Sequence, residues 1–376
     1  MKILYILKHN PWGIGGGCYA CRNYLELFSE LFLQDNIDVL ICSEYLQNQI
    51  DANLKNCKFI PVPPRSKFSQ SLSPITHILH RHQKTATKIL QRNYYDYCIF
   101  DHNSIAGSLV DLCKQKGIKT IVLNHNCELE YFKDNNGKLK NILLLSSVQK
   151  NEKNAYLKCD YNIFLTEEDN EIFKRLYGTS QTTTIIGGCF LRKEEKISET
   201  DSPFNDKLKI VISGTMGNVQ NKDGILYFLN ELYQYIPKDM EIILTGRNPS
   251  EEIINICKLH NNIQLIANPE NILDIVEKCD IFVCPTRLGG GMKLRLMDGL
   301  RCGLPVIAHR ISTRGYSFLK ERTVMSFENP EDFAKCINSL KQKIKAGEIY
   351  KRYIKQQTKE YFEFQSALNR MKIILQ

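Results

Sequence analysis

The first half of the chain alternates between short apolar runs and longer stretches in which apolar residues recur with a helical period. The apolar runs predict β-strands at Lys2–Leu7, Asp38–Cys42, Tyr97–Phe100, Thr120–Asn124 and Tyr161–Leu165. Between them, Cys18–Leu33 and Ser104–Lys116 have the helical pattern, and Leu25, Phe28 and Phe32 share one face of the first helix. Strands that alternate with helices predict a parallel, doubly wound sheet.

The same alternation starts again near Leu208 and predicts a second sheet of this kind. Its strands are expected at 208–212, Glu241–Leu244, Ile263–Ile266, Ile281–Cys284 and Pro305–Ala308. Residues 191–207 are rich in charge, Ser, Asp and Pro, which is typical of an interdomain linker. We therefore expect an α/β protein with a first domain at 1–190, a second at 208–350, and a C-terminal helix, 351–376, that packs back toward the first domain.

Length and composition agree with two globular domains. A single core usually stops growing at about 250–300 residues, and this chain has 376. Apolar residues make up 43% of the chain and charged residues 24%, which excludes a disordered protein. No apolar run approaches the ~20 residues that span a bilayer, and the apolar start is too short for a secretory signal. We expect a cytoplasmic protein.

The fourteen cysteines are scattered through apolar segments, as expected for buried thiols in a cytosolic protein. Cys18 and Cys21 form one C-x-x-C pair, but neither a second such pair nor a pair of histidines lies near it in the sequence. Helix packing therefore explains this pair better than zinc or redox chemistry. We expect no metal and no cofactor.

The net charge of +9 comes largely from one basic stretch. This stretch contains Lys55, Lys58, Arg65, Lys67, Arg81, Lys84, Lys88 and Arg92, against only Asp51 and Asp96. Residues 77–92 could form a basic helix with an apolar side. Its basic face is either solvated or docks on an anionic membrane surface or an acidic carrier. Nucleic-acid binding is not expected, because no stacking-aromatic or groove-reading motif accompanies the charge.

The clearest chemical motif lies after the expected strand Ile281–Cys284. Gly289, Gly290 and Gly291 would let backbone amides approach a ligand closely, and a helix is expected to begin near Met292. Lys293 and Arg295 would then lie in its first turn, where cations oppose the helix dipole unless an anion binds. A nucleotide diphosphate fits this requirement, and Asp298 could accept hydrogen bonds from its ribose. The alternative is a glycine-rich turn with solvated charges.

The first domain has a similar arrangement after its strands. Gly15, Gly16 and Gly17 follow the first strand, but the G-x-G-x-x-G pattern of nicotinamide enzymes is incomplete. His102 follows the strand Tyr97–Phe100, and His125 follows Thr120–Asn124. Loops at the carboxyl ends of parallel strands bind ligands in such sheets, so these histidines are candidate site residues. Loop histidines are nevertheless often structural or exposed.

Helix capping rather than catalysis is expected after the strand Tyr161–Leu165. Thr166 stands three residues before Asp169, which is typical of a helix N-terminus. We therefore expect Thr166 to cap the next helix.

These segments resemble GT-B glycosyltransferases of the family 4 type, the glycosyl transferases group 1. The resemblance is most specific at residues 281–308, where the glycine loop, the basic residues and Asp298 are followed by Gly303-Leu304-Pro305-Val306. It implies two Rossmann-like domains that face a central cleft, with diphosphate bound by the loop and the basic residues, and ribose bound by Asp298. It also implies that His102 lies near the donor sugar, that Gly15–Gly17 line the donor site, and that His125 and Glu128 lie on the acceptor side.

Two departures from the family pattern concern the donor site. The first glutamate of the family's E-x7-E pattern falls at Gly290, so its usual contact with the donor sugar is missing. The Arg and Lys often found after the first strand of the second domain are replaced by residues 213–222, where Asn221 matches one branch of the family. Lys293 and Arg295 would then neutralise the departing diphosphate.

The function implied by the resemblance is retaining, metal-independent transfer of a hexosyl group from a nucleotide-sugar, UDP- or GDP-linked, to a glycan or lipid-linked acceptor. His102, Lys293 and Arg295 would be the catalytic residues, and Met292 would line the donor site. Family context suggests bacterial surface polysaccharide or lipopolysaccharide synthesis, at the inner face of the cytoplasmic membrane. A non-hydrolysing sugar-nucleotide 2-epimerase and a non-catalytic nucleotide-sugar-binding subunit are the alternatives, and product analysis and donor turnover distinguish them.

Overall fold

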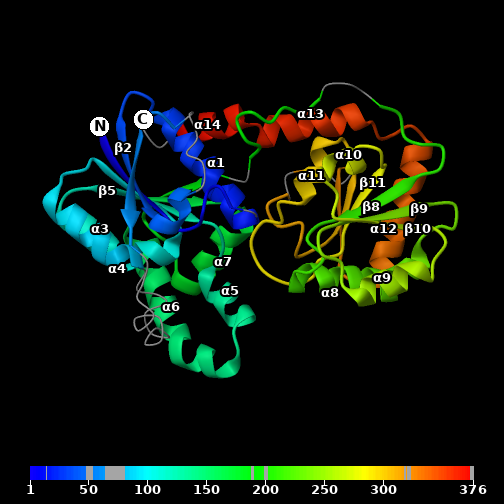
Figure 1. Cartoon of the computed structure of the whole chain (residues 1–376), viewed down its shortest axis with the longest axis horizontal. Coiled ribbons are helices and arrows are strands. Elements are labelled where there is room, and N and C mark those ends of the chain that lie inside the picture. Colours follow the sequence, from blue (N-terminus) through cyan, green and yellow to red (C-terminus); the bar gives the residue numbers. More distant parts are fainter. Residues whose placement is uncertain are drawn as a thin grey trace. The chain divides into compact units, whose positions relative to one another are not determined.

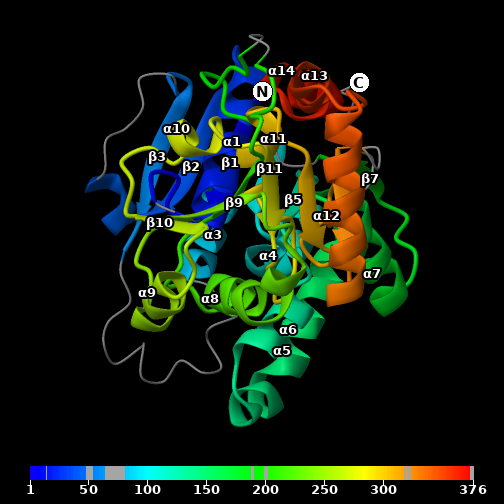
Figure 2. The same ribbon diagram turned by 90° about the vertical axis from the view of Figure 1, so that its right-hand side faces the viewer.

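A computed structural model of the chain describes residues 1–13, 15–47, 54–63, 81–187, 190–198, 202–316, 319 and 323–372. The chain forms two compact units (Figures 1 and 2). Unit 1 consists of Met1–Glu194 and Phe364–Gln376, and unit 2 consists of Glu195–Glu363. No helix among the described residues is both long and apolar enough to cross a membrane.

Unit 1 is built on a seven-stranded parallel sheet in the order β3-β2-β1-β4-β5-β6-β7. The strands are β1 Lys2–Leu7, β2 Asn36–Cys42, β3 Cys57–Val62, β4 Tyr97–Asp101, β5 Lys119–Asn124, β6 Tyr161–Phe164 and β7 Thr183–Ile186. The helices are α1 Gly16–Leu31, the 3₁₀ helix η1 Ser43–Gln47, α3 Arg81–Arg92, α4 Asn103–Gln115, α5 Glu128–Asn135, α6 Lys138–Lys158, α7 Glu167–Tyr177 and α14 Phe364–Lys372. The order changes direction between β1 and β4, so the sheet is doubly wound, as predicted.

Helices cover both faces of this sheet, which explains the continuous apolar runs in the sequence. In β1, Ile3 and Tyr5 point into a core with α1 and α14, whereas Leu4 and Ile6 point into a core with α3 and α4. A strand buried on both faces needs apolar residues at every position rather than at alternate ones.

Unit 2 has a six-stranded parallel sheet in the order β10-β9-β8-β11-β12-β13. The strands are β8 Lys209–Ser213, β9 Glu241–Gly246, β10 Ile263–Ala267, β11 Ile281–Cys284, β12 Val306–His309 and β13 Val324–Phe327. The helices are α8 Val219–Tyr227 with its extensions η3 Phe228–Leu232 and η4 Tyr233–Tyr235, α9 Glu251–Lys258, α10 Leu273–Val276, α11 Leu296–Arg301, α12 Pro330–Lys345 and α13 Lys351–Phe362. The predicted second α/β sheet is confirmed, and its strand order changes direction between β8 and β11.

The C-terminal segment differs from the single helix expected at 351–376. It forms two helices that break at Glu363, with α13 in unit 2 and α14 in unit 1. The break leaves Phe364, Leu368 and Met371 in the core beneath α1. Residues 191–207 are likewise divided, because Leu191 is buried in unit 1 and Glu195 pairs with Arg301 of unit 2 at 3.0 Å.

One buried ion pair attaches α13 to unit 2. The Lys351 ammonium group is 3.4 Å from the Asp280 carboxylate and donates to the Cys279 carbonyl at 2.9 Å. Asp280 also accepts a hydrogen bond from the backbone N–H of Lys209, at the start of β8. A buried charge is tolerated when it is paired and hydrogen-bonded in this way, so the pair fixes α13 against the sheet.

Candidate functional site

Polar side chains of unit 1 meet at the carboxyl ends of β1, β4 and β5. Lys8 follows β1, His102 follows β4, and Glu128 begins α5 after β5. The Glu128 carboxylate is 2.8 Å from His102 Nδ1 and 3.0 Å from Lys8 Nζ. Because β1 and β4 flank the point where the strand order reverses, this cluster occupies the usual ligand position of a doubly wound sheet.

A second carboxylate–histidine pair lies directly beside the first. His125 Nε2 is 2.6 Å from Asp101 Oδ1, and Asp101 is fully buried at the end of β4. The rings of His102 and His125 are stacked with centroids 4.6 Å apart and planes within 5° of parallel. His9 meets the His102 ring edge-on at 5.3 Å. The structure therefore brings the predicted His102, His125 and Glu128 together.

The ionisation of this cluster follows from burial and from its neighbours. Burial and the adjacent Lys8 hold the pKa of His102 well below its usual value. Burial alone would raise the pKa of Glu128, but Lys8 and His102 hold it well below its usual value. At neutral pH, Glu128 is thus a carboxylate that only accepts hydrogen bonds, so His102 Nδ1 carries the hydrogen. His102 Nε2 is then a hydrogen-bond acceptor.

The backbone at His102 is strained, which is typical of functional positions. Its φ of 140° lies in a region that non-glycine residues rarely adopt, at a cost of about 1–3 kcal/mol. The buried Glu152 of α6 holds the surrounding loops, since it accepts hydrogen bonds from the Glu128 backbone N–H, the Asn103 side chain and the Tyr177 hydroxyl. Burial raises the pKa of Glu152 to about 7.

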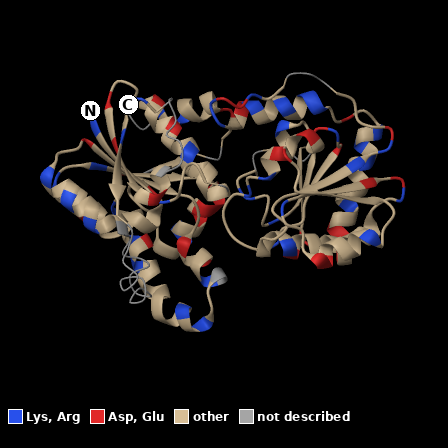
Figure 3. Cartoon of the chain, in the orientation of Figure 1, with Lys and Arg blue, Asp and Glu red and all other residues tan. Residues whose placement is uncertain are grey.

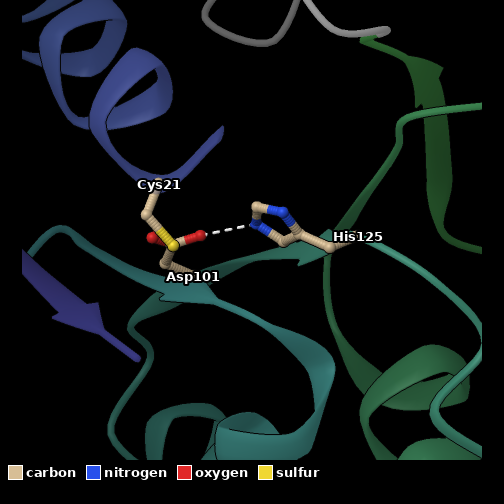
Figure 4. A group of neighbouring side chains, drawn as sticks. All are labelled: Cys21, Asp101 and His125. Atoms are coloured by element: carbon tan, nitrogen blue, oxygen red, sulfur yellow. Dashed lines mark hydrogen bonds and ion pairs between the residues drawn. The ribbon is translucent and has the colours of Figure 1, made fainter. Parts of the chain in front are cut away.

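Cys21, Asp101 and His125 form a compact group that could be considered for a metal ion (Figure 4). Their ligand atoms lie within 4.8 Å of one another. Zinc would require a thiolate and an unshared imidazole nitrogen. Here Asp101 Oδ1 already forms a hydrogen bond with His125 Nε2, so that imidazole nitrogen is shared. The geometry therefore favours a hydrogen-bonded group that orients His125.

The glycine loop of unit 1 leads into α1. Gly15 has a φ of 125° and precedes the helix, which begins at Gly16. A Cβ on Gly17 would lie 3.5 Å from the His9 ring, so this glycine lies next to the histidine group. Of the C-x-x-C pair, Cys21 is buried toward Asp101, whereas Cys18 is half-buried near Gly13.

The glycine loop of unit 2 depends on two left-handed residues. Gly289 and Gly291 have φ values of 84° and 68°, and a Cβ on Gly289 would lie only 2.4 Å from the Gln220 amide nitrogen. The predicted start of this helix near Met292 is wrong, because α11 begins at Leu296. Lys293 and Arg295 consequently lie in the loop and at the N-cap rather than in a first helical turn.

Side-chain contacts hold Arg295 at the end of β8 and Lys293 between the glycine loop and Gln220 of α8. Arg295 Nη1 donates to the Ser213 carbonyl at 3.0 Å, and its guanidinium covers Gly214, where a Cβ would lie 2.4 Å away. Lys293 Nζ is 3.2 Å from the Gly290 carbonyl and 3.4 Å from the Gln220 side chain. Since β8 and β11 flank the reversal of strand order in unit 2, both cations lie at the usual ligand position of this sheet.

Asp298 and Met292 complete the predicted residues of unit 2. Burial raises the pKa of Asp298 to about 6, against the opposing effects of Arg295 and Arg301. Asp298 is therefore mostly ionised at neutral pH and can accept hydrogen bonds. Met292 is almost completely buried.

The sequence analysis missed several residues that the structure adds to these two clusters. Lys8 and Asp101 could have been noticed, because each is a charged residue at the carboxyl end of an apolar strand. Glu152 gave no comparable signal, since it lies within a helix of mixed polarity. Arg314 belongs to no sequence motif either. Its guanidinium nevertheless lies beside the glycine loop, since a Cβ built on Gly290 would be 3.8 Å from it.

Comparison with known proteins finds relatives in sequence and in fold. Residues 207–343 match the family described as glycosyl transferases group 1. Over 243 residues the chain is 23% identical to an uncharacterized glycosyltransferase of Methanocaldococcus jannaschii, and the match spans 60% of each protein. Many solved structures share this fold, and two of them illustrate it. One is HepE of Anabaena in complex with UDP, with a TM-score of 0.71, 12% identity, and coverage of 100% of this chain and 99% of HepE.

The second is the lipopolysaccharide outer core galactosyltransferase WaaB, with a TM-score of 0.66, 14% identity, and coverage of 100% of this chain and 99% of WaaB. The chain therefore has the GT-B fold of these solved structures. Within this fold, residues 207–343 are similar to the glycosyl transferases group 1 family.

Proposed function

We propose that the chain transfers a hexosyl group from a UDP-sugar to a hydroxyl group of a glycan or lipid-linked acceptor, with retention of configuration and without a metal ion. The observation that carries this proposal is the loop with left-handed glycines, together with Lys293 beside that loop and Arg295 at the end of β8. Two cations and closely approachable backbone amides suit a diphosphate. HepE, which has the same fold, was solved with UDP, and this supports uracil as the donor base.

In the proposed reaction, the bond between the sugar C1 and the diphosphate oxygen breaks, and the acceptor oxygen bonds to C1 on the same face. The acceptor proton passes to the departing diphosphate. Negative charge therefore grows on the diphosphate, and Lys293 and Arg295 stabilise it in place of a divalent cation. Asp298 accepts hydrogen bonds from the ribose hydroxyls, and Met292 and Gly289–Gly291 shape the donor site.

The histidine cluster of unit 1 acts on the sugar and the acceptor in this proposal. His102 Nε2 accepts a hydrogen bond from a sugar hydroxyl, because Glu128 keeps the hydrogen of His102 on Nδ1. His125, oriented by Asp101, and Glu128 lie on the acceptor side. Gly15, Gly16 and Gly17 allow the substrate to approach the backbone beside His9.

An acceptor in surface polysaccharide or lipopolysaccharide synthesis is consistent with the likeness in fold to WaaB, a lipopolysaccharide outer core galactosyltransferase. Such an acceptor would place the protein at the inner face of the cytoplasmic membrane.

For the basic segment 77–92, residues 77–80 lie outside the described residues. In the described helix α3, Leu90 and Ala86 are buried, and Lys84, Lys88 and Arg92 are exposed. Contact of α3 with a membrane would therefore be electrostatic.

Thermal unfolding in EDTA with UDP, GDP, ADP, CMP and dTDP tests the donor site. UDP at about 100 times its Kd should add about 2.7 kcal/mol to the free energy of unfolding, and the other nucleotides should add less. Lys293→Ala and Arg295→Ala should each remove most of this shift. Lys258→Ala, at an exposed lysine of α9, is the matched control and should retain it.

A shift with a different diphosphate would replace UDP with that donor base. No shift with any nucleotide, together with no release of UDP from UDP-sugars, would contradict the proposed donor. An equal loss of the shift in Lys258→Ala would assign the effect to net charge rather than to the loop.

A further inference from the structure

The hairpin of α5 and α6 carries an apolar face that the described residues leave exposed. The hairpin extends away from the sheet of unit 1 (Figures 1 and 2). Leu139, Ile142 and Leu143 have exposed fractions of 73%, 78% and 58%. Residues three and four apart lie on the same face of a helix, so these three side chains form one patch, which we call the 139–143 face.

The core of the hairpin does not use this face. Leu144 and Val148 point inward and pack on Phe132 of α5, with Leu145 partly buried against them. The 139–143 face is therefore a second apolar surface of α6, next to the one that packs on α5. A contiguous exposed apolar patch usually marks an interaction site, so this face is expected to have a partner.

The charge around the 139–143 face is positive. Lys133, Lys138 and Lys140 are exposed at the end of the hairpin, where Figure 3 shows Lys and Arg gathered. Between residues 131 and 150, Asp134 is the only acidic residue in the sequence. An apolar face bordered by lysines is typical of helices that lie in the interface of a membrane, because the lysines meet lipid phosphates while the apolar side chains enter the acyl boundary.

A second copy of the chain fits this surface less well. A symmetric pairing places the same patch on both partners, so the lysines at the border would face each other and repel. Anionic lipid is the partner that complements both the apolar centre and the basic border.

We propose that the α5–α6 hairpin docks the protein on an anionic lipid bilayer, with Leu139, Ile142 and Leu143 inserted and Lys133, Lys138 and Lys140 on the headgroup phosphates. This is a different surface from α3, whose described apolar side chains are buried in the core. The proposal does not depend on the donor or the reaction. If the enzyme uses a lipid-linked acceptor, the hairpin would hold it at the surface where that acceptor lies.

Co-sedimentation of the full chain with phosphatidylglycerol–phosphatidylcholine vesicles and with pure phosphatidylcholine vesicles tests the proposal. The protein should bind the anionic vesicles, and binding should weaken with added salt. Ile142→Ser should reduce the partition coefficient about fivefold or more, since it removes a central apolar contact. Leu259→Ser is the matched control, because Leu259 is also 78% exposed but lies in unit 2, and it should bind like the wild type.

Three results would overturn the proposal: no binding of the wild type to anionic vesicles, equal binding by Ile142→Ser and the wild type, or equal loss in Leu259→Ser. Sedimentation velocity without lipid gives a further check, because a dimer that Ile142→Ser abolishes would assign the face to a second copy. The thermal shift with UDP should be the same in Ile142→Ser and the wild type. Failure of docking and failure of the donor site are therefore distinguishable.

Discussion

At the scale of single residues, Asp298 links the stability of unit 2 to pH. Burial raises its pKa in the folded state to about 6, whereas an unfolded Asp has a pKa of about 3.9. The folded state therefore holds this proton more tightly, so the contribution to stability is full below about pH 4. As the pH rises from about 4 through 6, this contribution is lost, which lowers the free energy of unfolding by about 3 kcal/mol.

We expect Asp298→Asn to be more stable than the wild type at pH 8, by up to about 3 kcal/mol, and equally stable near pH 4. Urea unfolding at pH 4, 6 and 8 measures this difference. Asp239→Asn is the control, since a hydrogen bond from Lys341 lowers the pKa of Asp239 and its replacement should not stabilise the protein at high pH. A pH-independent difference for Asp298→Asn would show that the carboxyl group does not titrate in this range.

Histidines after apolar strands were visible in the sequence, but their partners were not. His102 and His125 were predicted because each follows a strand, where ligands of such sheets bind, whereas Glu128 was implied by the family resemblance. Which carboxylate meets which ring depends on the neighbouring strands, since the pairing of β4 with both β1 and β5 brings Lys8, Asp101 and Glu128 together. A single sequence without a known strand order does not contain that information.

At the scale of elements, the cap of α7 was predicted from Thr166 and Asp169, and the structure confirms it. Thr166 Oγ1 accepts a hydrogen bond from the Asp169 backbone N–H at 3.0 Å. Thr166→Ala should therefore lower the free energy of unfolding by about 1 kcal/mol, whereas Thr166→Ser should have little effect. Denaturant unfolding measures both, and an equal loss in the two variants would mean that the methyl group rather than the cap stabilises the site.

The missed strands and the misplaced helix start have physical causes. β3, β7 and β13 lie at sheet edges, and the exposed Lys58 and Pro61 interrupt the apolar run of β3. Central strands buried on both faces were found because all their positions are apolar. The start of α11 was placed too early, because the left-handed Gly291 and the bond from Arg295 to Ser213 hold residues 292–295 outside the helix.

At the scale of the whole molecule, the core of unit 1 depends on residues that follow unit 2 in the sequence. Leu368 of α14 is buried with Leu25 and Phe28 of α1. Leu368→Ala should cost unit 1 about 2–5 kcal/mol, as large-to-small changes in a core do. Hydrogen exchange should become faster in β1 and α1 and stay unchanged in β8 and β9.

The matched control reverses this pattern. Leu340 is fully buried on α12 of unit 2, so Leu340→Ala should accelerate exchange in unit 2 and leave β1 and α1 unchanged. Equal acceleration in both units by either variant would show that the two units unfold as one cooperative body.

The division of unit 1 between two distant segments also bears on its synthesis. Unit 2 is contiguous in the chain, so it can complete its fold as soon as Glu363 has left the ribosome. Most of unit 1 is synthesised first, but the apolar face of α1 that packs on α14 stays uncovered until Phe364–Lys372 has been translated. During that interval a nascent chain exposes apolar side chains of α1, which makes this face a natural binding site for a chaperone.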